Sequence, residues 1–222
     1  MEDLILAVKP HYNTRSFKKR SVILYQGEIP RYANIITKGV VKVYSLSANG
    51  EEQVIRILSK DDVFSIPWLF EKTNHALYYY EAQTDCTVVC IEKKMFSDTV
   101  SNNPKLQAKL IDYLATLHTS SMIHITALEQ ARAREKILNI LYYLCLLSGS
   151  EFKPGKYKVE LHLTHGIIAS LSGLTRETTA LELSKLKKTR TVKYTARYYL
   201  IDKLKIEQLL GEDNFANLSL NK

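Results

Sequence analysis

Residues that can bind DNA gather at the start of a predicted short helix near the carboxyl end of the chain. Arginine can donate two hydrogen bonds to guanine, glutamate can accept one from cytosine, and threonine can contact a phosphate or a thymine methyl group. The residues of this kind in the segment are Thr175, Arg176, Glu177, Thr178 and Thr179. Their types and order predict contact with base edges and phosphates of double-stranded DNA.

A run of basic residues follows this helix directly. The segment from Lys185 to Lys205 holds eight lysines and arginines against one acid, Asp202. Such runs are usually solvated surface, but the position of this one favours phosphate contacts, which supply affinity without sequence information. The basic residues predicted to contact DNA are Lys185, Lys187, Lys188 and Arg190.

Two short helices joined by a turn must position these side chains. Thr164 is the predicted N-cap of the first helix and Thr175 that of the second, a plain cap because Glu177 is only two residues further on. Thr164 and His165 open the first helix and are also predicted to contact DNA. We expect Gly173 to make the turn where a side chain would crowd the crossing. Two extended segments, residues 191–194 and 198–201, predict a two-stranded wing.

The two regions further upstream differ in pattern. Residues 21–92 form short alternating runs punctuated by turns, of which Asn49-Gly50 is the strongest hairpin signal, and they predict a small β-sandwich or jelly-roll barrel. From Pro104 to Leu147 the pattern is helical, with Asn102 or Asn103 as its cap. A near-heptad spacing predicts a dimer interface along this helix. The residues assigned to it are Leu110, Leu114, Leu117, Ser121, His124 and Leu128, flanked by Leu106 and Ala131. A helix packed wholly within its own subunit is the alternative.

Composition narrows the class of protein. A net charge of +8 over 222 residues is typical of proteins with an anionic partner such as nucleic acid, although a basic protein without one is the alternative. No apolar run is long enough for a membrane span. The first residues, Met1-Glu2-Asp3, include two acids and do not resemble the basic start of a signal peptide. Three scattered cysteines favour a reducing cytoplasm. We find no nucleophile triad, phosphate-binding glycine loop or metal-ligand spacing, so we expect neither an enzyme nor a metal site.

The sequence resembles the Crp/Fnr family of bacterial regulators. The resemblance lies in residues 163–178, in the 39–44 and 49–52 hairpin, and in residues 81–91. It implies an α+β fold with an N-terminal β-roll (1–103), a long dimerisation helix (104–147) and a C-terminal winged helix-turn-helix (148–222). It also implies a homodimer that reads palindromic promoter DNA, base contacts by Arg176 and Glu177, and RNA polymerase as a further candidate partner.

One departure from the family pattern concerns the second helix. The family often has an arginine four residues after Glu177, and this chain has Leu181, which cannot hydrogen-bond to a base. The operator of better-known members therefore cannot be carried over. Leu181 also keeps an alternative function open, a ligand-binding or protein-interaction module whose helix no longer reads DNA.

The signal that such a regulator senses is not evident. Members that bind cyclic nucleotides resemble one another in a Gly-Glu pair followed by an arginine and a small hydroxyl residue. The matching stretch, residues 61–80, lacks the pair, and no arginine lies between Arg56 and Arg132. A buried cyclic phosphate needs a charged donor, so we expect no cAMP binding through that cassette. No cysteine precedes Cys86, which argues against the N-terminal iron–sulfur cluster of oxygen-sensing members.

Several further residues have two interpretations. Cys86 and Cys90 would share one face of a strand, as a redox pair or, more often, as small hydrophobic residues. His75, His118 and His124 could bind metal or haem, but solvated or interface histidines are the commoner case. Trp68, Phe70 and Tyr79 could line a pocket for an uncharged or aromatic effector, although core packing is the default. A regulator that is active without any small molecule is equally open.

Overall fold

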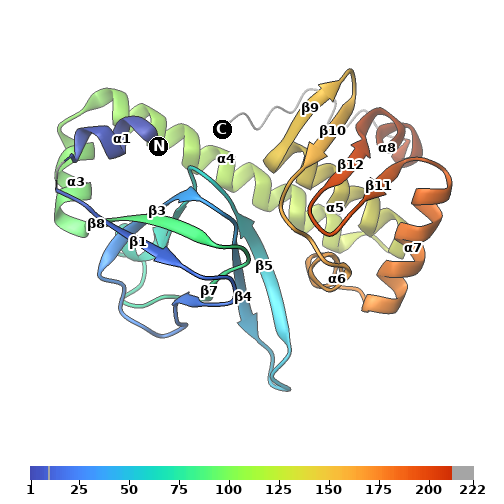
Figure 1. Ribbon diagram of the computed structural model, residues 1–222, viewed down its shortest axis with the longest axis horizontal. Helices are drawn as coiled ribbons and strands as arrows, with labels where there is room; N and C mark the ends of the chain where they lie inside the picture. Colours follow the sequence, from blue (N-terminus) through green and yellow to red (C-terminus); the bar gives the residue numbers. More distant parts are fainter. Residues whose placement is uncertain (10, 212–222) are drawn as a thin grey trace. The chain divides into compact units, whose positions relative to one another are not determined.

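The chain consists of two compact units in the computed structural model, which describes residues 1–9 and 11–211 (Figure 1). The first unit covers residues 1–112 and the second begins at Tyr113. The long helix α4 contains the point where the first unit ends and the second begins.

Two four-stranded antiparallel sheets build the described part of the first unit. One sheet has the order β1 (Asn13–Phe17), β8 (Cys86–Glu92), β3 (Tyr32–Lys38), β6 (Val63–Phe64). The other has the order β2 (Val22–Leu24), β7 (Tyr79–Ala82), β4 (Val41–Leu46), β5 (Glu52–Leu58). Ile36 and Val88 of the first sheet and Val41 and Val43 of the second share one buried core. The predicted jelly-roll type of domain is thereby confirmed, although the two sheets do not close into a barrel.

Local turn chemistry fixes the register of the β4–β5 hairpin. Gly50 has a φ of +78°, and the Ser47 amide donates to the Glu51 carbonyl at 2.9 Å. This confirms the turn predicted at Asn49-Gly50, because glycine adopts positive φ without strain. The short helices α1 (Glu2–Ala7), α2 (Ile66–Leu69) and α3 (Lys93–Ser101) complete the unit and were not predicted.

The predicted single helix over 104–147 is in fact two helices, α4 (Pro104–Glu129) and α5 (Ala133–Ser148). The helical conformation is interrupted at residues 130–132, and the backbone of Arg132 is extended, with a φ of −102° and a ψ of 138°. Asn103, one of the two predicted caps, accepts the amides of Lys105 and Leu106 at 3.1 and 3.2 Å. Helix α5 is buried from Ile137 to Cys145, so it is the core helix of the second unit.

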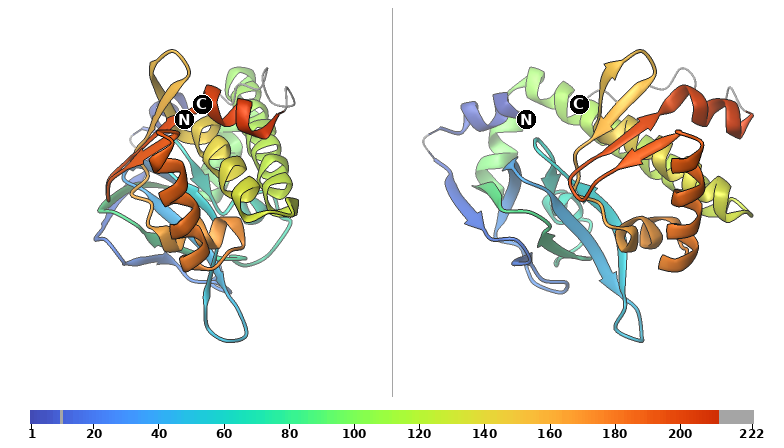
Figure 2. Two further views of the ribbon diagram at one scale, coloured as in Figure 1. Left: turned by 90° about the vertical axis from the view of Figure 1, so that its right-hand side faces the viewer. Right: turned by 45° about the vertical axis from the view of Figure 1, so that its right-hand side comes forward.

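The second unit packs its remaining elements around α5. Helices α6 (His165–Ser172), α7 (Arg176–Lys188) and α8 (Lys203–Leu210) contact it (Figure 2). A sheet of order β11 (Val192–Tyr194), β12 (Tyr199–Asp202), β10 (Lys156–Val159), β9 (Gly149–Lys153) contacts α5 through β9 and β10. The predicted wing is thus confirmed as β11 and β12, and β9 and β10 extend it. In the described part of the chain, no helix combines the length and apolar character that a membrane span needs.

Candidate nucleic-acid interface

Two threonine caps start the helices that form the candidate interface. The Thr164 hydroxyl oxygen accepts the Ile167 amide at 3.2 Å, and that of Thr175 accepts the Thr178 amide at 3.2 Å. The Thr175 hydroxyl also donates to Thr178 Oγ1 at 2.9 Å. Each bond satisfies an amide that has no partner within its own helix, so both predicted caps are confirmed.

Gly173 makes the turn between α6 and α7 for a different reason from the one expected. A methyl group added there would lie 3.5 Å from Leu128 Cδ2, which is an ordinary contact. The expected crowding was therefore wrong. The residue has a φ of +61°, and the Leu174 amide donates to the Ala169 carbonyl across the turn at 2.9 Å. The left-handed backbone conformation is what favours glycine here.

Helix α7 has a buried face and an exposed face. Thr179 is 0% exposed and lies with Leu183 and Leu186 on the buried face, so its predicted DNA contact is not compatible with the structure. Arg176 and Glu177 are exposed. The exposed face continues along the helix through Leu181, Ser184 and Lys188.

Three members of the basic run bind their own chain. Lys185 Nζ lies 2.6 Å from a carboxylate oxygen of Glu182, and Lys203 Nζ lies 3.0 Å from Glu207. Lys205 Nζ donates to the Thr189 carbonyl at 2.8 Å. The other five basic residues are exposed and surround the end of α7 and the wing. They are Lys187, Lys188, Arg190, Lys193 and Arg197.

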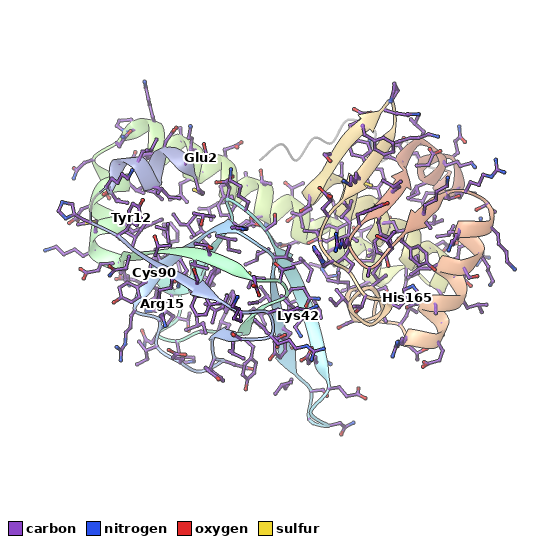
Figure 3. The ribbon with its side chains drawn as sticks, viewed as in Figure 1. Glu2, Tyr12, Arg15, Lys42, Cys90 and His165 are labelled. Atoms are coloured by element: carbon purple, nitrogen blue, oxygen red, sulfur yellow. The ribbon has the colours of Figure 1, made fainter. Side chains whose placement is uncertain are left out.

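His165 lies at the start of α6, near β11 of the wing and the start of α7 (Figure 3). Its ring meets that of Tyr194 edge-on at 5.2 Å, and Lys187 Nζ lies 5.3 Å from the centre of the same tyrosine ring. Burial, and the positive charge of Arg176, lower the pKa of His165. Sequence reasoning missed Tyr194, although an aromatic residue directly after Lys193 in a predicted wing strand was the available signal.

The DNA affinity of this surface is expected to rise as the pH falls through the ordinary histidine range. As the pH falls, neutral His165 gains a proton at a pKa below its ordinary value, and the cation then attracts phosphate. The gain between about pH 7.5 and about pH 6 should be about threefold, as for two exposed ion pairs, one per protomer. Binding titrations of the wild type and His165→Gln measure it.

Folding stability should change with pH in the opposite direction to DNA affinity, so the two effects of His165 protonation can be separated. A histidine whose folded pKa is lowered contributes stability above the unfolded pKa near 6.5, and this stability is lost as the pH falls. Thermal unfolding at each pH therefore checks that the protein is folded in the titration. An unchanged pH response in His165→Gln would assign the effect to another group.

The predicted dimer residues of α4 are largely occupied within their own chain. Leu110 is 7% exposed. His124 Nε2 lies 2.7 Å from the Leu171 carbonyl oxygen, and its ring stacks on Tyr143 at 5.2 Å. Leu128 lies beside Gly173. Leu110 is buried in the single chain, whereas His124 and Leu128 are half-buried and contact the helix-turn-helix of their own chain. The assignment of these three residues to a dimer interface stays a prediction.

A different face of α4 is left exposed. Leu114, Leu117 and Ser121 are half-buried, and their dimer contacts stay a prediction. One residue further along, apolar side chains recur at intervals of three and four, with Ile111 67% and Ile125 49% exposed. This exposed α4 stripe consists of Ala108, Ile111, Ala115, His118, Met122 and Ile125.

The three predicted effector residues have separate neighbours in the structure. Tyr79 stacks on Tyr44 at 5.1 Å, whereas the buried core side chain of β7 is the next residue, Tyr80. Tyr79 and Tyr80 point to opposite faces of the strand, since side chains alternate along it. The assignment of Tyr79 to an effector pocket stays a prediction. Lys93 Nζ lies over the Trp68 ring, 5.1 Å from the ring centre. Phe70 is exposed.

Aromatic side chains of the first unit pack together in its core. Tyr80 stacks on Phe64 at 4.9 Å, and burial raises the pKa of Tyr80 to about 12. Ala76, in the stretch that matches the nucleotide cassette, belongs to the same core. Burial also raises the pKa of the Cys86 and Cys90 thiols, which favours their interpretation as small hydrophobic residues.

Comparison with known proteins places both units in established families. Residues 14–103 match the cyclic nucleotide-binding domain family, and residues 135–210 match the Crp-like helix-turn-helix domain family. The HTH-type transcriptional regulator ArcR of Staphylococcus haemolyticus is 26% identical over 201 residues, covering 90% of this chain and 87% of its own.

Solved structures agree on the fold. FixK2 of Bradyrhizobium japonicum superposes with a TM-score of 0.74 at 21% identity, covering 89% of this chain and 96% of its own. A CooA mutant of Carboxydothermus hydrogenoformans superposes with a TM-score of 0.73 at 21% identity, covering 95% of this chain and 90% of its own. The chain is a transcription regulator with a helix-turn-helix DNA-binding domain. It belongs to the Crp/Fnr family.

Proposed function

We propose that the protein is a homodimer that binds a palindromic promoter site in the cytoplasm, where chromosomal DNA lies, and that it has no enzymatic activity. The observation that carries the proposal is the exposed pair Arg176 and Glu177 at the capped start of α7. In helix-turn-helix proteins this end of the second helix enters the major groove. The exposed lysines and arginines around α7 and the wing supply phosphate contacts of the kind that orient such a helix.

The exposed α4 stripe supports the homodimer. Two copies that pair along the same face bury the same residues on both sides, as a two-fold interface requires. The spacing of three and four residues is that of a coiled-coil seam. A dimer of this kind presents two copies of α7, so its site has two half-sites related by the same two-fold symmetry.

Control by cAMP through the usual cassette is not part of the proposal. The cassette stretch has no arginine, and Ala76 and Tyr80 belong to the core of the first unit. The stretch itself therefore supplies no guanidinium group to pair with a buried phosphate.

Leu181 favours a second candidate, a module in which α7 binds another protein. A selection from random DNA duplexes separates the two functions. We expect enrichment of a palindrome with half-site centres about 10 base pairs apart. Affinity for it should fall about 10³- to 10⁵-fold between about 50 and about 200 mM salt, as for six to ten phosphate contacts. Failure to enrich any sequence would contradict the proposal and favour the second candidate.

A further inference from the structure

Leu181 is an apolar side chain on an otherwise polar helix face. It is 56% exposed, and its neighbours on that face are Glu177, Ser184 and Lys188. At about 100° per residue, these four positions lie within a narrow stripe along α7. The opposite face carries Leu183 and Leu186, which are buried, so packing within the unit does not account for a leucine at 181.

The stripe that contains Leu181 begins in the part of α7 proposed to enter the major groove. Leu181 follows Glu177 by one helical turn, about 6 Å along the axis. Base pairs are about 3.4 Å apart. A helix that brings Glu177 to a base edge therefore brings Leu181 to the groove one or two base pairs further along.

The chemistry of leucine restricts what it can recognise there. It can neither donate nor accept a hydrogen bond, and covering a donor or acceptor of a base without replacing its water would cost free energy. In the major groove, the C5 methyl group of thymine is the apolar feature that the base pairs offer. The surrounding charged and hydroxyl side chains argue against a protein partner, whose interfaces need a larger apolar centre.

We propose that Leu181 determines operator specificity by contacting the methyl group of a thymine in each half-site. This inference rests on the proposed function, and it adds a base preference that Arg176 and Glu177 do not supply. The half-site should thus contain an invariant T·A pair one or two positions from the pair read at the start of α7.

Replacing thymine by deoxyuridine tests the contact, because it removes the methyl group and leaves base pairing unchanged. The operator selected with the wild-type protein is substituted at one symmetric pair of thymines at a time. At one pair we expect a loss of about fourfold per half-site, the size of one buried methyl group, and so about fifteenfold for the dimer. Leu181→Ala should bind the thymine and uracil operators equally well.

Two further variants keep the test specific. Ser184→Ala, at the adjacent exposed position, should retain the full thymine-to-uracil difference. Leu181→Gln should change the preference at that position toward adenine in the contacted strand, which glutamine can bind with two hydrogen bonds. All three substitutions are at exposed positions, and circular dichroism verifies that each variant is folded.

The outcomes distinguish this inference from the proposed function. If the wild type binds a selected operator and no thymine shows a methyl effect, Leu181 does not read thymine, although the protein still binds DNA. A thymine effect that persists unchanged in Leu181→Ala overturns the inference in the same way. If no operator is selected, both the inference and the proposed function are wrong.

Discussion

Replacing Met122 and Ile125 together by aspartate is expected to convert the protein from a dimer to a monomer. Both side chains lie on the exposed α4 stripe, about half exposed in the single chain. In a two-fold dimer each substitution occurs twice, so four carboxylates would be brought into an apolar seam. Burying unpaired charges costs several kilocalories per mole, which disfavours association along this face.

Loss of the dimer should reduce affinity for the full operator by at least about 100-fold. A dimer holds its second α7 near the second half-site at an effective concentration that a free monomer does not reach. Sedimentation velocity measures the oligomeric state, and titrations with full and single half-sites measure the DNA affinity. Binding to a single half-site should be nearly unchanged, because α7 and the wing are not altered.

A control for added charge is available on the same helix. Lys105 is exposed on α4 and lies away from the stripe, near the helix start, where an acidic residue is favourable. Lys105→Asp should remain a dimer with its operator affinity reduced only slightly. A Met122→Asp, Ile125→Asp protein that still sediments as a dimer would place the interface elsewhere.

The α4 residues illustrate why the sequence predicted a dimer helix but not its face. Apolar residues satisfy two overlapping heptad patterns, one through Leu106, Leu110 and Tyr113, which are buried in the chain, and one through Ile111 and Ile125. Adjacent positions differ by about 100° around a helix, so only the tertiary structure shows which pattern is already covered.

Structural features that depend on neighbouring residues were predicted well from the sequence, whereas features that depend on tertiary packing were not. The caps Thr164 and Thr175 and the Gly50 turn depend on neighbouring residues alone, and they were predictable. The interruption of the long helix at residues 130–132 contains neither proline nor glycine, so the sequence carries no helix-breaking residue that would predict it. Strand β1 was missed because most of it is exposed, without the alternation that identifies a half-buried strand.

Thr179 shows a related limit within the candidate site. Its residue type suits DNA contact, and its neighbours Arg176 and Glu177 are exposed. Helical periodicity nevertheless places it on the face of Leu183 and Leu186, four and seven residues further on. Residue type alone thus predicts too many DNA contacts, and the helical periodicity identifies Thr179 as the residue to exclude.

Arg176→Ala and Lys188→Ala should lower DNA affinity in two distinguishable ways. Arg176, exposed at the start of α7, is placed to pair with a guanine through two hydrogen bonds, each such pair giving about 1–3 kcal/mol of discrimination. Since a dimer makes two of them, Arg176→Ala should lower affinity for the selected operator about 30-fold or more. It should also bind operators substituted at that base pair as well as the original.

Lys188→Ala removes a charge near the end of the same helix. Its exposed ammonium group is placed to contact a phosphate, and a phosphate looks the same at every base pair. The variant should therefore lose affinity for all sequences about equally, with a salt dependence weaker by about one phosphate contact per half-site. Both substitutions introduce alanine, the best helix former, at exposed positions, so α7 should be retained. Equal losses on every sequence for both variants would mean that Arg176 contacts only the DNA backbone, and the operator would then be read by other residues of α7.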